Sequence, residues 1–211
     1  MDVTVDTVTE VGPETIALEF HTPDDFDALP GQFVVLRATP EGEDEELTRY
    51  YTLSSPGVED TFEVTVGIDP EGSLSPWLAT LEGGETVEID GPYGDVTYER
   101  EGDVVAVAGG PGVGPAVAIA EAAHQAGHEA TVIYQDDDPA HVDRLESLED
   151  AGGEVVVLAE SQDDALAEAV AEHLEDGQFY VFGFSGFVEH VAGAIEDAGG
   201  DADAALIENF G

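Results

Sequence analysis

The chain has 211 residues, 42% of them hydrophobic, which is enough for one large domain or two small domains with real cores. Only four residues are basic, 49 are acidic and none is lysine, so the formal net charge is −45. Such a chain cannot neutralise a row of phosphates, which argues against nucleic acids and anionic membranes as partners. The acidic residues are spread along the whole chain. Because the Debye length falls to about 3 Å in molar salt, we interpret the composition as an adaptation to high salt.

Cysteine is absent, which excludes disulfides, thiolate catalysis and Cys-ligated zinc or iron–sulfur sites within this sequence. His124 and His128 are four residues apart, but no third ligand lies near them in the sequence, so we expect no metal site. The N-terminal residues read as a strand rather than a signal peptide, and no apolar run approaches a membrane span. We therefore expect a soluble, cytoplasmic protein.

The first half of the chain alternates apolar and polar residues in short stretches. The predicted strands are 3–5, 15–20, 33–37, 51–53, 61–66 and 86–89, and turns rich in glycine and proline separate them. Such spacing favours an antiparallel barrel or sandwich. The acidic run 41–46 is predicted to be a solvated loop.

The pattern changes near residues 98–102. Apolar runs at 104–108, 131–134, 154–158, 179–182 and 204–207 then alternate with helical patterns at 115–126, 141–150, 163–175 and 186–198. This alternation predicts an α/β doubly wound domain with a parallel sheet of about five strands. We therefore expect two domains, 1–98 and 99–211, with ligands bound at the carboxyl ends of the strands.

Three segments could carry chemistry, and each has a plainer alternative. The glycine-rich loop 109–115 between a buried strand and a helix could hold a pyrophosphate, or it could be a tight turn. Arg49, beside Tyr50 and Tyr51, could clamp a phosphate, or it could form a surface ion pair. The hydroxyls and N–H groups of segment 72–78 could complete a phosphate site, or they could simply cap a short helix.

Taken together, these segments resemble one family. Arg49-x-Tyr51-Thr52, preceded by Pro30-Gly31-Gln32-Phe33, is similar to the flavin signature of the ferredoxin–NADP reductase superfamily. The other matching motifs, in the family's order, are Gly72-x-x-Ser75-x-x-Leu78, the glycine-rich stretch 81–94, the loop 108–115 and Glu208-x-Phe210. The resemblance covers essentially the whole chain.

The resemblance implies a six-stranded, antiparallel, Greek-key flavin-binding barrel followed by a nicotinamide-nucleotide-binding α/β domain. FAD is the implied flavin, with FMN less favoured, and NADH or NADPH is the implied hydride donor. The implied catalytic residues are Thr52 near the hydride acceptor, Tyr51 packed on the flavin, and Glu208 as a proton relay. The implied cofactor-binding residues are Arg49, Tyr50, Tyr51, Thr52, Val66, Gly67, Ile68, Gly72, Ser73, Ser75, Gly110, Gly112, Val113, Gly114, Pro115, Gly183, Phe184 and Phe210.

Two positions depart from the family pattern. Phe182-Gly183-Phe184 stands where the family often has Cys-Gly-Pro, so Phe182 could stack on the nicotinamide or exclude it. Asp136, Asp137 and Asp138 follow the second strand of the α/β half, where NADP-dependent relatives commonly offer basic residues. Carboxylates there would repel a 2′-phosphate, which favours NADH.

The sequence thus predicts an FAD-dependent oxidoreductase that passes electrons from NAD(P)H to an acceptor such as a ferredoxin or another redox protein. Two alternatives remain at this point. One is an electron-transfer subunit of a larger complex whose partner holds the iron–sulfur or haem centre. The other, motivated by the missing thiol, is a flavin- or nucleotide-binding module without turnover.

Overall fold

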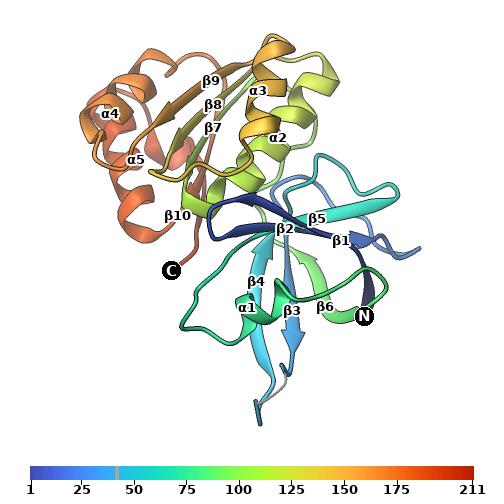
Figure 1. Ribbon diagram of the computed structural model, residues 1–211. Helices are drawn as coiled ribbons and strands as arrows, with labels where there is room; N and C mark the ends of the chain where they lie inside the picture. Colours follow the sequence, from blue (N-terminus) through green and yellow to red (C-terminus); the bar gives the residue numbers. More distant parts are fainter. Residues whose placement is uncertain (41–42) are drawn as a thin grey trace.

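The structure of the protein, a computed structural model, describes residues 1–40 and 43–211. Residues 41 and 42 of the predicted acidic loop lie outside the described residues. The chain forms an antiparallel β-structure, blue to green in Figure 1, and an α/β unit, green to red, that lies against it. The first sheet ends at Tyr93 and the second begins at Val104.

The first half is the six-stranded antiparallel barrel that the family resemblance implies, one of the two architectures that the alternating pattern favours. Its strands have the order β4-β3-β6-β1-β2-β5, and a bridge between Leu53 and Val64 joins the two ends of that order. Side chains that point inward, such as Leu18, Phe62 and Ile89, are fully buried in its core. Its elements are β1 (Asp2–Gly12), β2 (Thr15–His21), β3 (Phe33–Ala38), β4 (Leu47–Thr52), β5 (Thr61–Gly67), α1 (Leu74–Leu78) and β6 (Thr86–Tyr93).

The second half is the predicted α/β domain, a parallel sheet with the strand order β11-β10-β7-β8-β9. Helices α2 and α3 cover one face of the sheet, and α4 and α5 cover the other. The central strand β7 is buried along its whole length, as its unbroken apolar run predicts. The elements are β7 (Val104–Gly109), α2 (Val113–Ala126), β8 (Ala130–Gln135), α3 (Val142–Asp150), β9 (Glu154–Leu158), α4 (Asp163–Glu172), β10 (Gln178–Gly183), α5 (Ser185–Asp197) and β11 (Leu206–Asn209).

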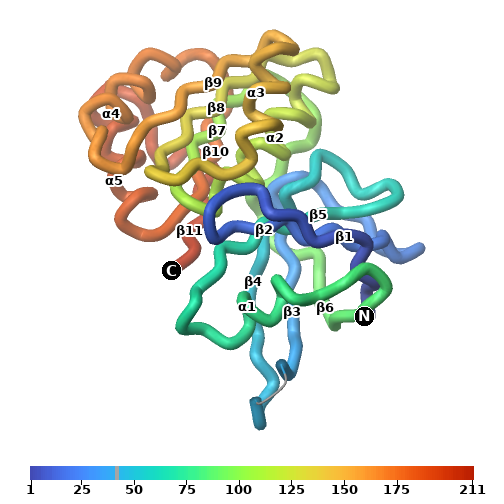
Figure 2. Tube along the Cα trace, viewed as in Figure 1, coloured from blue at the N-terminus to red at the C-terminus, as the bar shows by residue number. Residues whose placement is uncertain are grey.

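Most element boundaries differ from the sequence prediction by a few residues, and strand β1 (Asp2–Gly12) is much longer than the predicted 3–5; two of the differences have a clear local cause. Helix α2 begins at Val113 rather than Pro115, because a 3-10 turn over Gly110–Gly112 leads directly into it. Strand β11 begins at Leu206 rather than residue 204, because residues 202–204 form a 3-10 turn that the Asp201 carboxylate caps by accepting from the Asp203 N–H. Figure 2 shows β11 beside β10, with the chain end emerging from β11 on the side of the α/β domain that faces the barrel.

Small residues let the two halves approach closely. A Cβ atom on Gly114, in the first turn of α2, would lie 2.3 Å from the Thr65 Oγ1 on β5. A Cβ atom on Gly12, at the end of β1, would lie 2.8 Å from the Cβ of Ala140. Any larger residue would force the halves apart, since packed interiors leave no room for added atoms.

A charged network crosses the same interface. The Arg144 guanidinium on α3 donates to both carboxylate oxygens of Glu121 on α2, at 2.9 and 2.7 Å. Its Nη1 also donates to the Glu63 Oε1 on β5 at 3.0 Å, and the Ser54 hydroxyl donates to the same oxygen at 2.7 Å. Burial raises the pKa of Glu63, and the Arg144 charge opposes that rise. The guanidinium therefore offsets the cost of holding two carboxylates at the interface.

No helix among residues 1–40 and 43–211 is both long enough and apolar enough to cross a membrane.

Replacing Arg144 with Met should loosen the contact between the two halves. The methionine keeps much of the aliphatic stem but leaves Glu63 and Glu121 without their shared cation. We expect the free energy of unfolding to fall by about 1.5–3 kcal/mol, the range for hydrogen bonds to charged groups, measured by urea unfolding in molar salt. Arg37→Met is the matched control, because Arg37 pairs with Asp90 on the barrel surface, where little change is expected. Equal losses in the two variants would contradict a special role for Arg144.

Candidate functional site

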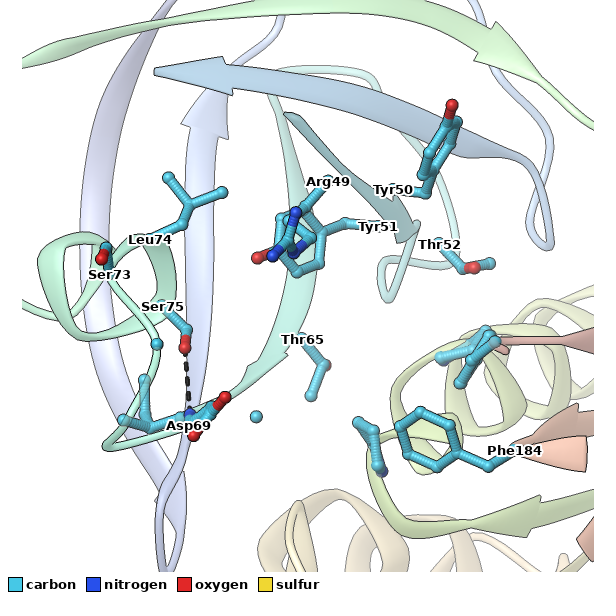
Figure 3. A pocket seen from close by; sticks show the side chains of 16 residues that line it. Arg49, Tyr50, Tyr51, Thr52, Thr65, Asp69, Ser73, Leu74, Ser75 and Phe184 are labelled. Carbon is cyan, nitrogen blue, oxygen red and sulfur yellow. Dashed lines mark hydrogen bonds between the residues drawn. The ribbon is translucent and has the colours of Figure 1, made fainter. Parts of the chain in front are cut away.

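A cavity of about 550 Å³ lies between the barrel and the α/β domain. Strand β4, the end of β5 and the segment leading into α1 form the barrel side, and the start of α2, the loop after β10 and the C-terminal residues form the opposite side (Figure 3). The cavity is lined by Arg49, Tyr50, Tyr51, Thr52, Thr65, Gly67, Ile68, Asp69, Gly72, Ser73, Leu74, Ser75, Pro111, Pro115, Phe184 and Phe210. The structure thus gathers most of the sequence-predicted binding residues from two halves of the chain.

Strand β4 presents four consecutive side chains, from Arg49 to Thr52, to this cavity. Successive side chains of a strand point to opposite faces. The cavity therefore follows the edge of β4, which is the last strand in the order of the first sheet. Tyr50 is 69% exposed and meets Phe33 edge-on, with the ring centroids 5.8 Å apart, and Figure 3 shows it pointing away from Tyr51.

Arg49 is the arginine that lines this cavity. Arg37 and Arg144 pair with carboxylates, and Arg100 donates to the Pro56 carbonyl at 2.6 Å. Within the part of the chain that the structure describes, Arg49 has no carboxylate at ion-pair distance, and its Nη1 donates to the Thr48 carbonyl at 2.8 Å. An uncompensated guanidinium at a cavity wall in so acidic a protein fits a phosphate group, which guanidinium binds with two hydrogen bonds.

Tyr51 and Thr52 supply an aromatic ring and a hydroxyl beside this charge. Burial raises the pKa of Tyr51 to about 12, against a smaller opposing effect from the Arg49 charge, so its hydroxyl stays protonated at neutral pH. The ring packs partly against the barrel core. The neutral Tyr51 ring, packed partly on apolar core residues, can stack against the flat face of an aromatic ring system.

Thr52 also reaches the C-terminal strand. Its hydroxyl donates to the Glu208 Oε1 on β11 at 3.2 Å, although 156 positions separate the two residues. Burial raises the pKa of Glu208, and the hydrogen bond from Thr52 opposes that rise. Two of the predicted catalytic residues are therefore joined across the domain contact, while Glu208 itself lies behind Thr52 and does not line the cavity.

The segment between β5 and α1 closes the cavity on the barrel side. The Ser75 hydroxyl accepts from the Asp69 N–H at 3.0 Å, drawn as a dashed line in Figure 3, so its own proton stays available to a ligand. The Ser73 hydroxyl donates to the Glu43 carboxylate at 2.5 Å. Ile68 also lines this wall, and space is open where a Cβ on Gly67 would stand. Val66, by contrast, is fully buried in the barrel core, so only its backbone could meet a ligand.

Some residues of the predicted glycine-rich loop 109–115 pack in the protein interior, and others line the cavity. Gly112 and Gly114 are buried, and a Cβ on Gly112 would lie 2.3 Å from the Phe182 carbonyl oxygen. Val113 is also buried, whereas Pro111 and Pro115 line the cavity. Gly110 has φ +57° with open space around it, so it supplies the left-handed backbone of the turn. The predicted contact of these glycines with a pyrophosphate stays a prediction.

Of the two phenylalanines in the 182–184 segment, Phe184 rather than Phe182 lines the cavity. Phe182 is fully buried in the core of the α/β domain. Phe184 is 54% exposed and meets Phe210 edge-on, with the ring centroids 6.0 Å apart. The Phe210 N–H donates to the Gly183 carbonyl at 2.9 Å, which holds the chain end against this loop. Phe182, at the position where the family often has cysteine, therefore cannot reach a ligand in the cavity with its side chain, whereas Phe184 can.

Sequence reasoning missed some cavity residues. Thr65 and Leu74 read as ordinary members of a strand and a short helix. Asp69 was one acidic residue among many, so nothing in the sequence marked it. It lines the cavity beside Ser75, whose hydroxyl accepts from its N–H.

Comparison with known proteins gives two family matches. Residues 2–98 match the oxidoreductase FAD-binding domain, and residues 92–205 match the dimethylamine monooxygenase subunit DmmA-like N-terminal domain. Together these matches run through both halves of the chain.

Individual relatives agree with these matches. The chain is 36% identical over 104 residues to NADH-cytochrome b5 reductase 1 of Emericella nidulans, which covers 47% of this chain and 34% of the relative. It is 30% identical over 206 residues to the flavohemoprotein of Vibrio cholerae, which covers 88% of this chain and 52% of the relative. The chain thus spans only a third to a half of these relatives' lengths.

A solved structure shares the whole fold. A ferredoxin NADP+ reductase from Neisseria gonorrhoeae with bound FAD and NADP superposes with a TM-score of 0.82 at 20% identity, covering 100% of this chain and 98% of the other. The six-stranded barrel and the parallel five-stranded sheet therefore follow a known fold. The chain belongs to the family of the dimethylamine monooxygenase subunit DmmA-like N-terminal domain, whose match covers more than half of its residues. Its first half matches the oxidoreductase FAD-binding domain, and the whole chain has the fold of ferredoxin–NADP reductases.

Proposed function

We propose that this protein binds FAD in the cavity between its two halves, takes hydride from a nicotinamide nucleotide and passes electrons to a redox protein. The observation that carries the proposal is the cavity itself, in which Arg49, Tyr51 and Thr52 of the barrel face Phe184 and Phe210 of the α/β half. FAD, when bound, supplies the redox chemistry. The chain's own part is to hold the cofactor, orient it and exclude water.

Each wall of the cavity has a role in this proposal. The Arg49 guanidinium would neutralise a flavin phosphate, and the Ser75 hydroxyl would donate to the same group. The Tyr51 ring would pack on the flavin, and the Thr52 hydroxyl would lie at its reactive edge. Glu208, hydrogen-bonded to Thr52, would hold a proton close to that edge. Residues 1–98 would thus bind FAD and residues 99–211 the nicotinamide nucleotide.

NADH is the proposed hydride donor. The Asp136 carboxylate at the end of β8 accepts from the Tyr134 hydroxyl at 3.0 Å and from the Asp138 N–H at 2.8 Å. The Asp137 carboxylate accepts from the Glu160 N–H at 3.0 Å. Carboxylates held in place there support rejection of a 2′-phosphate and acceptance of a ribose hydroxyl.

The electron acceptor is proposed only as a class. The names of the relatives mention cytochrome b5 and ferredoxin, and those relatives are longer than this chain. That difference in length also favours a second candidate, in which this chain is the reductase module that serves a redox centre elsewhere in a larger assembly. A ferredoxin fits either case. A cytoplasmic location, expected from the sequence, stays a prediction.

The visible spectrum tests the central proposal. Protein purified in molar salt should show flavin bands, and NADH added without oxygen should bleach them, faster than NADPH does. Absence of flavin bands, also after incubation with FAD, would refute the proposal. Bands that NADH cannot bleach would instead favour a flavin-binding module without turnover.

Arg49→Ala should weaken flavin retention. Loss of a charge-assisted hydrogen bond pair of about 1.5–3 kcal/mol corresponds to roughly 10- to 100-fold weaker binding. Titration of the flavin-free protein with FAD, followed by fluorescence quenching, measures the change. Arg37→Ala removes an arginine from the same barrel outside the cavity and should leave FAD affinity unaltered. Unaltered FAD affinity in Arg49→Ala would contradict the phosphate role.

Thr52→Val should raise the pKa of Glu208 further above its ordinary value. The hydroxyl of Thr52 stabilises the ionised carboxylate, so its removal favours the protonated form. Carbon-detected NMR titration of the Glu208 carboxyl in the FAD-free protein measures this directly.

Because burial already raises the pKa of Glu208, the ionised carboxylate lowers the folding stability above that pKa. Glu208→Gln should therefore stabilise the protein at neutral pH and lose that advantage as the pH falls.

A further inference from the structure

Helix α3 begins next to a histidine in an unusual conformation. His141 has φ +55°, in the left-handed region that favours glycine and asparagine, yet it is only 3% exposed. Its N–H donates to the Val11 carbonyl of β1 at 2.8 Å, and its carbonyl accepts from the N–H groups of Arg144 and Leu145. A buried side chain kept in a strained conformation, at the contact between two domains, indicates that the side chain itself is needed there.

The side chain of His141 binds the barrel wall of the cavity. Its Nε2 lies 2.7 Å from the Oγ1 of Thr65, which is buried on β5 and lines the cavity two residues before Gly67. Burial, with the Arg144 charge nearby, lowers the pKa of His141 to about 3, so the imidazole is neutral at physiological pH. One of the two groups donates and the other accepts, which makes a bond between neutral groups that salt screens little.

The same hydroxyl is the point that α2 packs against. A Cβ on Gly114 would lie 2.3 Å from the Thr65 Oγ1, so the first turn of α2 rests on this group. Pro111 and Pro115, on either side of Gly114, form cavity wall on the α/β side. The Thr65 hydroxyl is therefore where the barrel wall, the start of α2 and the start of α3 meet.

We propose that His141 is a positioning residue: by fixing the Thr65 hydroxyl, it sets how closely the first turn of α2 lies over the barrel side of the cavity. This inference rests on the proposed function, because the two walls would carry the nicotinamide and the flavin. Hydride transfer depends steeply on their alignment, whereas the phosphate and ring contacts that hold each nucleotide lie mainly within one half. Loss of the His141–Thr65 bond should therefore slow transfer more than it weakens binding.

Three variants separate the hydrogen bond from the backbone conformation. His141→Asn keeps a residue that tolerates the left-handed backbone, but its amide is too short to reach Thr65. His141→Gln places an amide nitrogen about as far along the side chain as Nε2 and should rescue the bond. Thr65→Val removes only the hydroxyl. His173→Asn is the matched control, because His173 is also buried, at 4% exposure, and binds Asp176 within the α/β domain.

Anaerobic bleaching by saturating NADH is the first readout. His141→Asn and Thr65→Val should slow it by ~10- to 100-fold, the range expected for a small misplacement of reacting groups. In His141→Asn, whose residue does not line the cavity, the Kd for NADH and the FAD content should stay as in the unsubstituted protein, and His141→Gln should recover most of the rate. The double variant should be no slower than either single one, because both remove the same bond. Unslowed bleaching, or a loss of NADH affinity that matches the loss of rate, would overturn the proposal.

Amide hydrogen exchange in the FAD-free protein is the second readout. Exchange at the amides of Val113, Gly114, Ala116 and Val117 should accelerate in His141→Asn and Thr65→Val but not in His173→Asn. Unaltered exchange at these amides would contradict the proposal, whether or not the protein binds flavin. The two proposals also fail differently: an unsubstituted protein without flavin bands refutes the proposed function, while the exchange experiment still decides whether His141 holds the first turn of α2.

Discussion

One face of strand β5 carries the contact on which the rest of the structure depends. Glu63 and Thr65 are two residues apart and so point to the same side of the strand. Glu63 accepts from Arg144, and Thr65 bonds to His141, three residues earlier at the start of the same helix. The start of α3 is thereby attached to the barrel by two side chains, and α2 is attached through Glu121. This contact holds the two walls of the cavity at a defined separation.

The four arginines show how an acidic chain uses the few cations it has. One pairs on the barrel surface, one ties the connection between the halves to the loop after β4, and one joins three elements at the interface. The fourth, Arg49, faces the cavity with only a backbone partner among the described residues. At the cavity wall, a guanidinium without a carboxylate partner among the described residues can pair with an anionic ligand.

High salt weakens some of these contacts more than others. At molar ionic strength, exposed pairs such as Arg37–Asp90 are almost fully screened, and a net charge of −45 ceases to drive the halves apart. The contacts that remain effective are short and buried: the close approach at Gly114, the bond between Thr65 and His141, and the partly buried Arg144 network. The geometry of the cavity therefore depends on packing and neutral hydrogen bonds more than on long-range charge.

Local patterns in the sequence determined much of this protein. Alternation with period two, the shift to a strand–helix rhythm, and turns rich in glycine and proline predicted the barrel and the α/β domain, because these signals act within a few residues. The motif around Arg49 and the segment 67–75 predicted one wall of the cavity for the same reason. Only the tertiary structure decided that Glu208 meets Thr52, that His141 meets Thr65, and that Phe184 rather than Phe182 faces the cavity. These contacts join residues far apart in the chain, and they depend on how two domain surfaces pack, which no local periodicity encodes.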